Sequence, residues 1–335
     1  MKRLLVLILT ALMLTGCSGK PQEEVPQAAL EVEETLSTQE TVYTDTVVLD
    51  IQEPEQEAEI ILVPPEPVRP DILQPVASGE LTAENGKAII DYSHAEDGYV
   101  MVRYIGDRDC RLKVRVQNET TYTYNLTKGE WEVFPFTDGN GTYQVKVYEN
   151  TSGSSYAIAM ATELEVTLED EFAPFLRPNQ YVNFSDATKA VELAWELTKD
   201  IDNPLGKVEA VYSYVVKELS YDNEKAQTVK SGYIPDLDEI LELKKGICFD
   251  YASLMTAMLR SQGIPCKMVF GHTGGAYHAW ISVWTADTGW VDGVIFFDGI
   301  AWQRLDPTFA SYDNQSESIM NYIGDGKNYK EKYFY

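Results

Sequence analysis

Three residues whose side chains act together in nucleophilic catalysis lie at similar intervals in the second half of the chain: Cys248, His278 and Asp306. Cys248 follows Gly246 and begins a run with the apolar spacing of a helix. A thiol at a helix N-terminus faces unpaired backbone N–H groups and the positive end of the helix dipole, and both favour the thiolate. The same N–H groups can hold an oxyanion. This pattern predicts that Cys248 is a nucleophile.

His278 and Asp306 are of the types that a thiol nucleophile requires as partners. His278 belongs to an alternating stretch, 277–284, which predicts a strand that holds the imidazole as a general base. Asp306 ends a later strand and is placed to accept the other imidazole N–H, fixing the tautomer and orientation of the ring. Such a set attacks an amide carbonyl, forms a thioester and passes the acyl group to water or to an amine.

Helices precede strands around these residues, which indicates an α+β domain over 171–335. We expect Ser185 to cap a first helix that runs through Asp200, and a third helix to stop at Gly246. The expected helices are 185–200, one from 203 onwards, 236–245 and one from 248 to about 263. The expected strands are 267–271, 277–284, 293–297 and 301–306.

The second half of the chain resembles the transglutaminase-like core. The residues that carry the resemblance are Gly246-Ile-Cys248-Phe-Asp250-Tyr-Ala252, His278-Ala-Trp280 and Asp306-Pro-Thr308. The resemblance implies a papain-like fold of helices packed on an antiparallel sheet, and a catalytic triad of Cys248, His278 and Asp306 with no cofactor or metal. An aromatic donor in relatives implies that Tyr221 donates to the oxyanion. We expect Asp250 to cap or orient the catalytic helix, and Trp280, which shares a face with His278, either to wall the cleft or to pack in the core.

The region before this domain, 78–170, changes to a period of two residues. About seven short strands separated by turn sequences predict an antiparallel, immunoglobulin-like β-sandwich. Clusters of titratable residues that could do chemistry are absent from its sequence. We interpret it as a spacer or a binding module.

The N-terminus has the pattern of a bacterial lipoprotein signal. Lys2 and Arg3 precede an 11-residue apolar stretch that ends at Leu14-Thr-Gly-Cys17, so 1–16 is expected to be a signal peptide and Cys17 the lipid-bearing residue. An ordinary secretory signal is the alternative. The segment 17–77 is rich in proline and acidic residues, with 14 acidic and 2 basic residues between 20 and 71, which predicts a disordered tether. The protein is therefore expected on the extracytoplasmic face of a cell membrane, held by its lipid anchor.

The composition excludes one class of partner and leaves two classes of function. A formal net charge of −26 disfavours binding to nucleic acid. The first hypothesis is a peptidase, amidase or transamidase that acts on a peptide, protein or cell-wall amide. The alternative is a non-catalytic surface lipoprotein that binds a substrate or partner with the same fold, and a purely structural lipoprotein would leave the three residues unexplained. Cys266 is expected to be a core cysteine. His272 is expected to be solvated in a loop, and the alternative is that it reaches the cleft.

Overall fold

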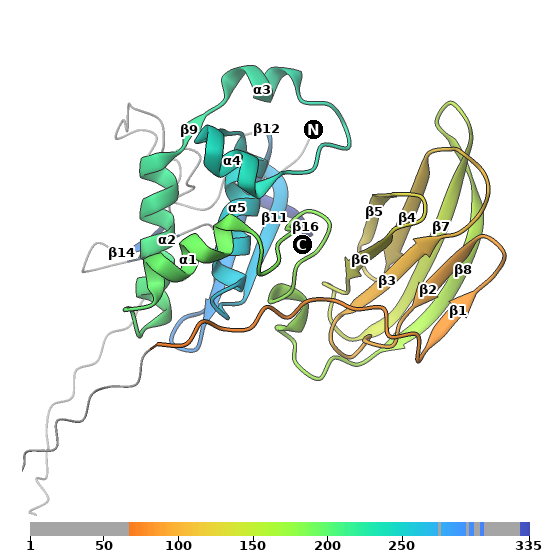
Figure 1. The fold of residues 1–335 in the computed structure, drawn as a ribbon, viewed down its shortest axis with the longest axis horizontal. Helices are drawn as coiled ribbons and strands as arrows, with labels where there is room; N and C mark the ends of the chain where they lie inside the picture. The colour runs from red at the N-terminus through yellow and green to blue at the C-terminus, as the bar shows by residue number, and fades with distance from the viewer. Residues whose placement is uncertain (1–66, 274–275, 293–294, 298–301, 305–328) are drawn as a thin grey trace, which may run out of the picture. The chain divides into compact units, whose positions relative to one another are not determined.

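The computed structural model describes residues 67–273, 276–292, 295–297, 302–304 and 329–335 (Figure 1). The predicted signal peptide, Cys17, most of the predicted tether and Asp306 lie outside the described residues. Among the described residues, no helix has the length and apolar character needed to cross a membrane. The described residues all belong to one compact unit, 63–335.

The first part of this unit is a sandwich of two four-stranded antiparallel sheets, as the period of two residues predicts. One sheet has the order β1-β2-β3-β6 and the other β5-β4-β7-β8. Inward-facing residues alternate with outward-facing ones, most regularly in β4, which gives a core of valine, tyrosine and phenylalanine side chains. The strands are β1 (Thr82–Glu84), β2 (Ala88–Asp91), β3 (Tyr99–Tyr104), β4 (Leu112–Gln117), β5 (Thr121–Leu126), β6 (Trp131–Pro135), β7 (Gly141–Ser152) and β8 (Ser155–Val166).

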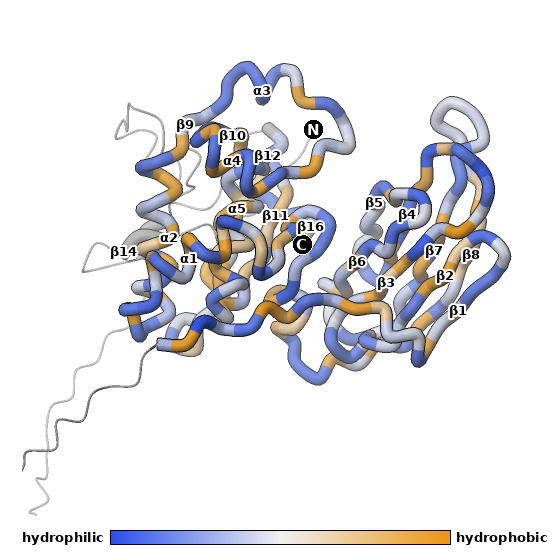
Figure 2. Tube along the Cα trace, in the orientation of Figure 1, coloured by the Kyte–Doolittle hydropathy of each residue, from blue (hydrophilic) through white to orange (hydrophobic). Residues whose placement is uncertain are grey.

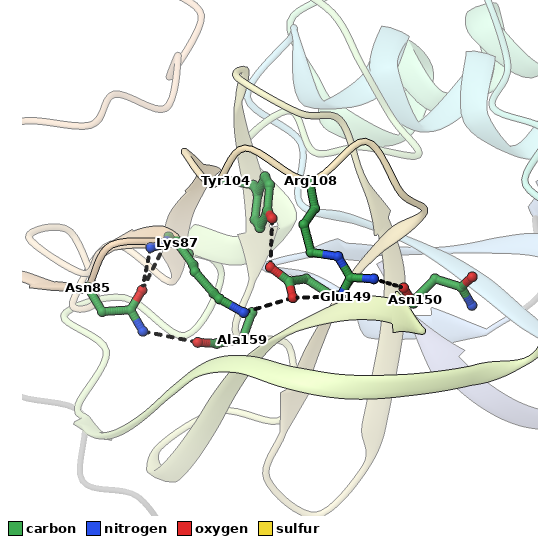
Figure 3. A network of polar contacts seen from close by, with 8 residues as sticks. Asn85, Lys87, Tyr104, Arg108, Glu149, Asn150 and Ala159 are labelled. Atoms are coloured by element: carbon green, nitrogen blue, oxygen red, sulfur yellow. Dashed lines mark hydrogen bonds and ion pairs between the residues drawn. The ribbon is translucent and has the colours of Figure 1, made fainter. Parts of the chain in front are cut away.

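The carboxylate of Glu149 is buried in this sandwich and is fully paired (Figure 3). Glu149 of β7 is 2% exposed. Its oxygens accept a hydrogen bond from the Tyr104 hydroxyl at 2.6 Å and form ion pairs with Lys87 at 2.8 Å and Arg108 at 3.2 Å. The bond from Lys87, followed by that from Tyr104, holds the pKa of the Glu149 carboxyl below its usual value. Burial raises the pKa of Tyr104 to about 12, so at neutral pH the hydroxyl is a donor.

This network predicts that part of the stability is lost in acid. A carboxyl whose folded-state pKa is depressed stabilises the fold above its unfolded pKa, and that contribution disappears as the pH falls through the folded pKa. We expect the free energy of unfolding to fall between pH 5 and pH 3, and Glu149→Gln to reduce this fall. Urea unfolding at both pH values measures the difference. An unchanged pH dependence in Glu149→Gln would contradict the assignment.

The second part is an α+β domain in which helices pack on an antiparallel sheet, which confirms the predicted fold. The main sheet has the order β13-β12-β11-β16, and two smaller pairs are β9 with β10 and β14 with β15. The helices are α1 (Lys189–Thr198), α2 (Pro204–Glu218), α3 (Asn223–Thr228), α4 (Leu237–Leu243) and α5 (Cys248–Arg260). The strands are β9 (Ser220–Tyr221), β10 (Lys245–Gly246), β11 (Cys266–Thr273), β12 (Ala276–Thr285), β13 (Gly289–Asp292), β14 (Ile295–Phe297), β15 (Trp302–Arg304) and β16 (Tyr329–Phe334).

Two predicted helix ends are wrong by a few residues. Thr188, not Ser185, precedes the first turn of α1, because the Ser185 N–H donates to the Thr188 hydroxyl at 2.9 Å and forms a turn instead. Helix α4 ends at Leu243, and the next residue, Lys244, adopts the left-handed conformation expected of Gly246. Gly246 is needed for a close approach, since a Cβ there would lie 2.7 Å from the Cβ of Asp250.

The main sheet contains two strands, β13 and β16, that the sequence did not predict. The described residues of the expected strand 293–297 form β14, and β13 precedes it as the partner of β12. The last strand, β16, is antiparallel to β11. Its sequence is rich in lysine and tyrosine and does not alternate clearly, so its pairing was not predicted.

Helix α5 lies in the core of this domain. Its residues from Asp250 to Arg260 are all buried, and they share one apolar cluster with Cys266 and Met268 of β11 and with Ala279, Ile281 and Val283 of β12. At its C-terminal end the guanidinium of Arg260 is also buried. It donates to the backbone carbonyls of Cys266 at 2.9 Å, Arg177 at 2.6 Å and Tyr335 at 2.6 Å. Arg260 therefore joins α5 to β11, to the segment before α1 and to the end of β16.

Aromatic side chains connect the sandwich to the α+β domain. Tyr124 of β5 lies 5.6 Å, ring centre to ring centre, from Tyr181 and 5.8 Å from Tyr335. The chain before β1 contacts both parts: Arg69 forms ion pairs with Asp186 and Glu192, and the Val76 N–H donates to the Tyr99 hydroxyl. Residues 67–77, the described end of the predicted tether, contain no helix or strand.

Candidate active site

Cys248 is the first residue of α5, at the position that the sequence predicts. Ile247 precedes it in an extended conformation, and the thiol is half-buried. The parallel pairing of β9 with β10 places Tyr221 opposite Gly246, two residues before Cys248. The helix N-terminus, the thiol and the Tyr221 side chain are thus brought together by a strand pair of only two residues each.

Asp250 fixes the start of this helix. Its carboxylate accepts a hydrogen bond from the Ile247 N–H at 2.8 Å, which confirms its expected role as a cap. The side chain is 0% exposed. Lys225 of α3 lies 2.7 Å from one carboxylate oxygen, and the Tyr233 hydroxyl donates to the other at 2.6 Å. The buried carboxylate is therefore held by three donors.

Cys248 borders a pocket of about 480 Å³. Half of the lining residues are aromatic, and Lys230 adds an ammonium group. Burial raises the pKa values of Tyr181 and Tyr277 to about 12, so their hydroxyls remain protonated at neutral pH. The aromatic lining residues are Tyr181, Tyr221, Tyr233, Phe249, Phe270, Tyr277 and Tyr335. The pocket can accommodate an apolar group beside a thiol and offers several hydroxyl donors.

His278 follows Tyr277 on β12, the strand next to β11. Successive strand residues point to opposite faces, so His278 and Trp280 share the face opposite to Tyr277. Two observations agree with this: Tyr277 stacks on Phe270 at 5.7 Å, and the His278 ring lies 6.3 Å from the Trp280 ring. His278 is 7% exposed. The structure brings Cys248 and the His278 strand to adjoining elements, and a bond between the thiol and the imidazole stays a prediction.

The other histidine near the pocket is His272 of β11. Its residue partner across the sheet is Tyr277, so the two side chains share a face, with ring centres 5.4 Å apart. His272 is exposed, as expected, but it lies in a strand and not in a loop. A test of the proposed base therefore has to include both histidines.

The remaining predicted residues divide into three groups. Tyr221 lines the pocket, as a donor to an oxyanion requires, whereas Trp280 is 1% exposed on the opposite face of β12. Asp306 and Cys17 lie outside the described residues. The sequence patterns did not identify Lys225, Tyr233 or Tyr277 as residues of the site. Tyr277 could have been identified, because strand alternation assigns it and His278 to opposite faces of the sheet.

Cys266 shows the burial expected of a core cysteine. It is 0% exposed, and burial raises the pKa of its thiol to about 12. Within the described residues, no group of three or more His, Cys, Asp or Glu side chains is arranged to hold a metal ion.

These environments predict the order in which the cysteines react. We expect iodoacetamide at neutral pH to alkylate Cys248 quickly and to leave Cys266 unmodified, because only the former is reachable at a helix N-terminus. Cys110 is half-buried like Cys248 but does not begin a helix, so it serves as the comparison. Peptide mass spectrometry over a time course measures all three rates. Equal rates for Cys248 and Cys110 would contradict activation of the thiol.

Comparison with known proteins identifies the class of this domain. Residues 191–307, which include Cys248, His278 and Asp306, match the family model of the transglutaminase-like superfamily. These residues therefore form a transglutaminase-like domain, and the match supports a cysteine enzyme.

Two curated proteins and a solved structure are similar to parts of this chain. The uncharacterized protein YebA of Bacillus subtilis is 34% identical over 119 residues, which are 30% of this chain and 16% of that protein. The protein-glutamine gamma-glutamyltransferase of Pseudomonas aeruginosa is 31% identical over 68 residues, 16% of this chain and 10% of that protein. The chain thus spans less than a fifth of the length of either relative. The crystal structure of the periplasmic domain of TgpA from Pseudomonas aeruginosa aligns with a TM-score of 0.32 and 16% identity, over 72% of this chain and 98% of that one.

Proposed function

We propose that this protein is a cysteine acyl-transfer enzyme that acts on a peptide, protein or cell-wall amide. The observation that carries the proposal is the position of Cys248, whose thiol begins α5 and borders an aromatic pocket. The name of the Pseudomonas relative, a protein-glutamine gamma-glutamyltransferase, supports an amide substrate. The motif around His278 and Asp306 supports these two residues as base and orienting carboxylate.

The reaction takes place in two transfers. The Cys248 thiol gives its proton to His278, and the sulfur forms a bond to the amide carbonyl carbon. The oxyanion that develops is held by the N–H groups at the start of α5, with the Tyr221 hydroxyl as a further donor. When the carbon–nitrogen bond breaks, the amine leaves with the proton from the imidazolium. Water or a second amine then attacks the thioester carbonyl carbon and gives a proton to the imidazole. The carbon–sulfur bond breaks, and sulfur departs as the thiolate beside the imidazolium.

A direct test uses a glutamine-containing peptide with and without a primary amine. Ammonia release in both cases, with a new amide only when the amine is present, would establish acyl transfer, and release of ammonia alone would indicate hydrolysis. Peptide-bond cleavage in place of ammonia release would indicate a peptidase. If Cys248→Ala matches the unchanged protein in every assay, the enzyme proposal fails.

A binding function is the second candidate, and one observation favours it. Strand alternation directs His278 to the face opposite to Tyr277, whereas a general base must reach the thiol in the reacting complex. A binding protein would use the aromatic pocket without the base. It would retain a peptide ligand with unchanged affinity in Cys248→Ala and would release no product.

We further propose that the protein is anchored to the extracytoplasmic face of a membrane through acyl chains on Cys17. The support is the Leu14-Thr-Gly-Cys17 motif after a basic and then apolar leader. Intact-mass analysis of detergent-extracted protein is expected to show a chain that begins at Cys17 and carries the added mass of acyl groups. A water-soluble product cleaved elsewhere would contradict the anchor, and Cys17→Ala is the control.

A further inference from the structure

Lys225, Tyr233 and Asp250 form a closed set of contacts behind the nucleophile. The Lys225 ammonium lies 2.6 Å from the Tyr233 hydroxyl, 2.7 Å from the Asp250 carboxylate and 4.3 Å from the centre of the Tyr233 ring. The Tyr233 hydroxyl lies 2.6 Å from the other Asp250 oxygen. Each of the three groups therefore contacts the other two.

The positive charge of Lys225 compensates the negative charge of the buried Asp250 carboxylate. A carboxylate that is 0% exposed is costly unless a cation and hydrogen-bond donors compensate it. Among the described residues, the cation that pairs with this carboxylate is Lys225, whose side chain is 26% exposed. Asp250 is the third residue of α5 and Cys248 the first. An uncompensated anion at this point would disfavour the thiolate at the same helix end.

The same contacts hold one wall of the pocket. Lys225 comes from α3, a helix that is hydrophilic along most of its length (Figure 2), and Tyr233 comes from the segment between α3 and α4. Tyr233 lines the pocket together with its neighbours Lys230, Ser231 and Gly232. The ion pair thus connects this wall to the helix that carries the nucleophile.

We infer that Lys225 is a positioning residue for the reaction: it neutralises Asp250 so that the Cys248 thiolate forms, and it fixes the pocket wall through Tyr233. This inference rests on the proposed function. It concerns the state of the thiol, which can be measured without substrate turnover. Lys225 does not line the pocket and reaches the site through Asp250 and Tyr233.

Other titratable groups face the same region and remain in place in the test. Tyr221, Lys230, Tyr277 and Tyr335 line the pocket around Cys248. On the outer side, Lys245 pairs with Asp222 at 3.2 Å. The carboxylates of Asp236 and Glu239 act on Tyr233 from the side of α4.

The test is the pH dependence of Cys248 alkylation by iodoacetamide, followed by peptide mass spectrometry. At an effective dielectric constant of about 20, a unit charge about 12 Å away corresponds to a shift of about one pH unit. We therefore expect Lys225→Met to move the midpoint about one pH unit upward and to slow alkylation about tenfold at pH 7. Lys225→Arg keeps the charge and is expected to move the midpoint much less. Lys244→Met removes a lysine that pairs with Glu218 and is the matched control, with no expected shift.

Removing the carboxylate as well separates electrostatics from packing. In Lys225→Met combined with Asp250→Asn no buried anion remains, so the midpoint is expected to return toward that of the unchanged protein. A midpoint in Lys225→Met equal to that in Lys244→Met would overturn the inference, and so would a double variant with the full upward shift. Either result leaves the proposed function standing, because that function fails when Cys248→Ala matches the unchanged protein in every assay of amide turnover.

Discussion

Cys248→Ser is expected to lower kcat/KM for amide turnover by about 10⁴-fold or more while the melting temperature stays nearly unchanged. The reason is that a serine hydroxyl has almost the same size but is a far weaker nucleophile without a base strong enough to ionise it. Steady-state assays with the glutamine peptide and thermal unfolding of the same preparation measure both effects. Substantial turnover in Cys248→Ser would remove the thioester from the mechanism.

The histidine variants identify the base. His278→Ala is expected to lower kcat about as much as Cys248→Ser, because residues that act as one unit are lost together. His272→Ala is the matched control, since this histidine lies on the pocket face beside Tyr277, and it is expected to retain most activity. The opposite result would assign the base to His272. Asp306→Asn is expected to reduce the rate, because the equivalent substitution in a serine triad lowers kcat by ~10⁴-fold.

Arg260→Leu is expected to have the largest effect on stability, a loss of about 3–5 kcal/mol in the free energy of unfolding. The substitution removes three charge-assisted hydrogen bonds and leaves the carbonyls of Cys266, Arg177 and Tyr335 without this donor in a buried site. Burial lowers the pKa of Arg260 to about 10, so the charge that makes these bonds is present throughout the neutral range.

Urea unfolding with an unchanged m-value measures this loss. Arg103→Leu is the control, because Arg103 donates a 2.7 Å bond to one carbonyl, that of Gly129, from a half-buried position. We expect that variant to lose about 1 kcal/mol. Equal losses in the two variants would show that burial of the Arg260 guanidinium adds nothing to the free energy of unfolding.

Local patterns in the sequence were enough to predict the two-part architecture. The alternation in β4 reports a sheet with one buried face, and the Gly246 to Cys248 sequence reports a helix start. Helix ends were predicted less accurately because neighbouring residues can form competing turns. Ser185, for example, forms a turn with Thr188 and does not cap the helix. The strand β16 was not predicted because its partner, β11, lies more than fifty residues earlier in the chain.

The candidate site shows the same division between local and long-range information. The position of Cys248 and the capping by Asp250 depend on neighbouring residues, and both were predicted. The contacts of Lys225 and Tyr233 depend on how three separate segments meet, and no spacing rule connects them. The side-chain direction at Tyr277 follows from alternation, but which face of the sheet receives α5 is decided by tertiary packing.

The aromatic contacts between β5 and the pocket limit how this protein can be divided. Tyr124 belongs to the sandwich, yet it packs on Tyr181 and Tyr335, which both line the pocket beside Cys248. Excision of residues 78–170 would expose these rings to water and free them to take other rotamers. The sandwich is therefore not an exchangeable module in a recombination experiment, and a transplanted α+β domain would need a new surface to replace the one that Tyr124 provides.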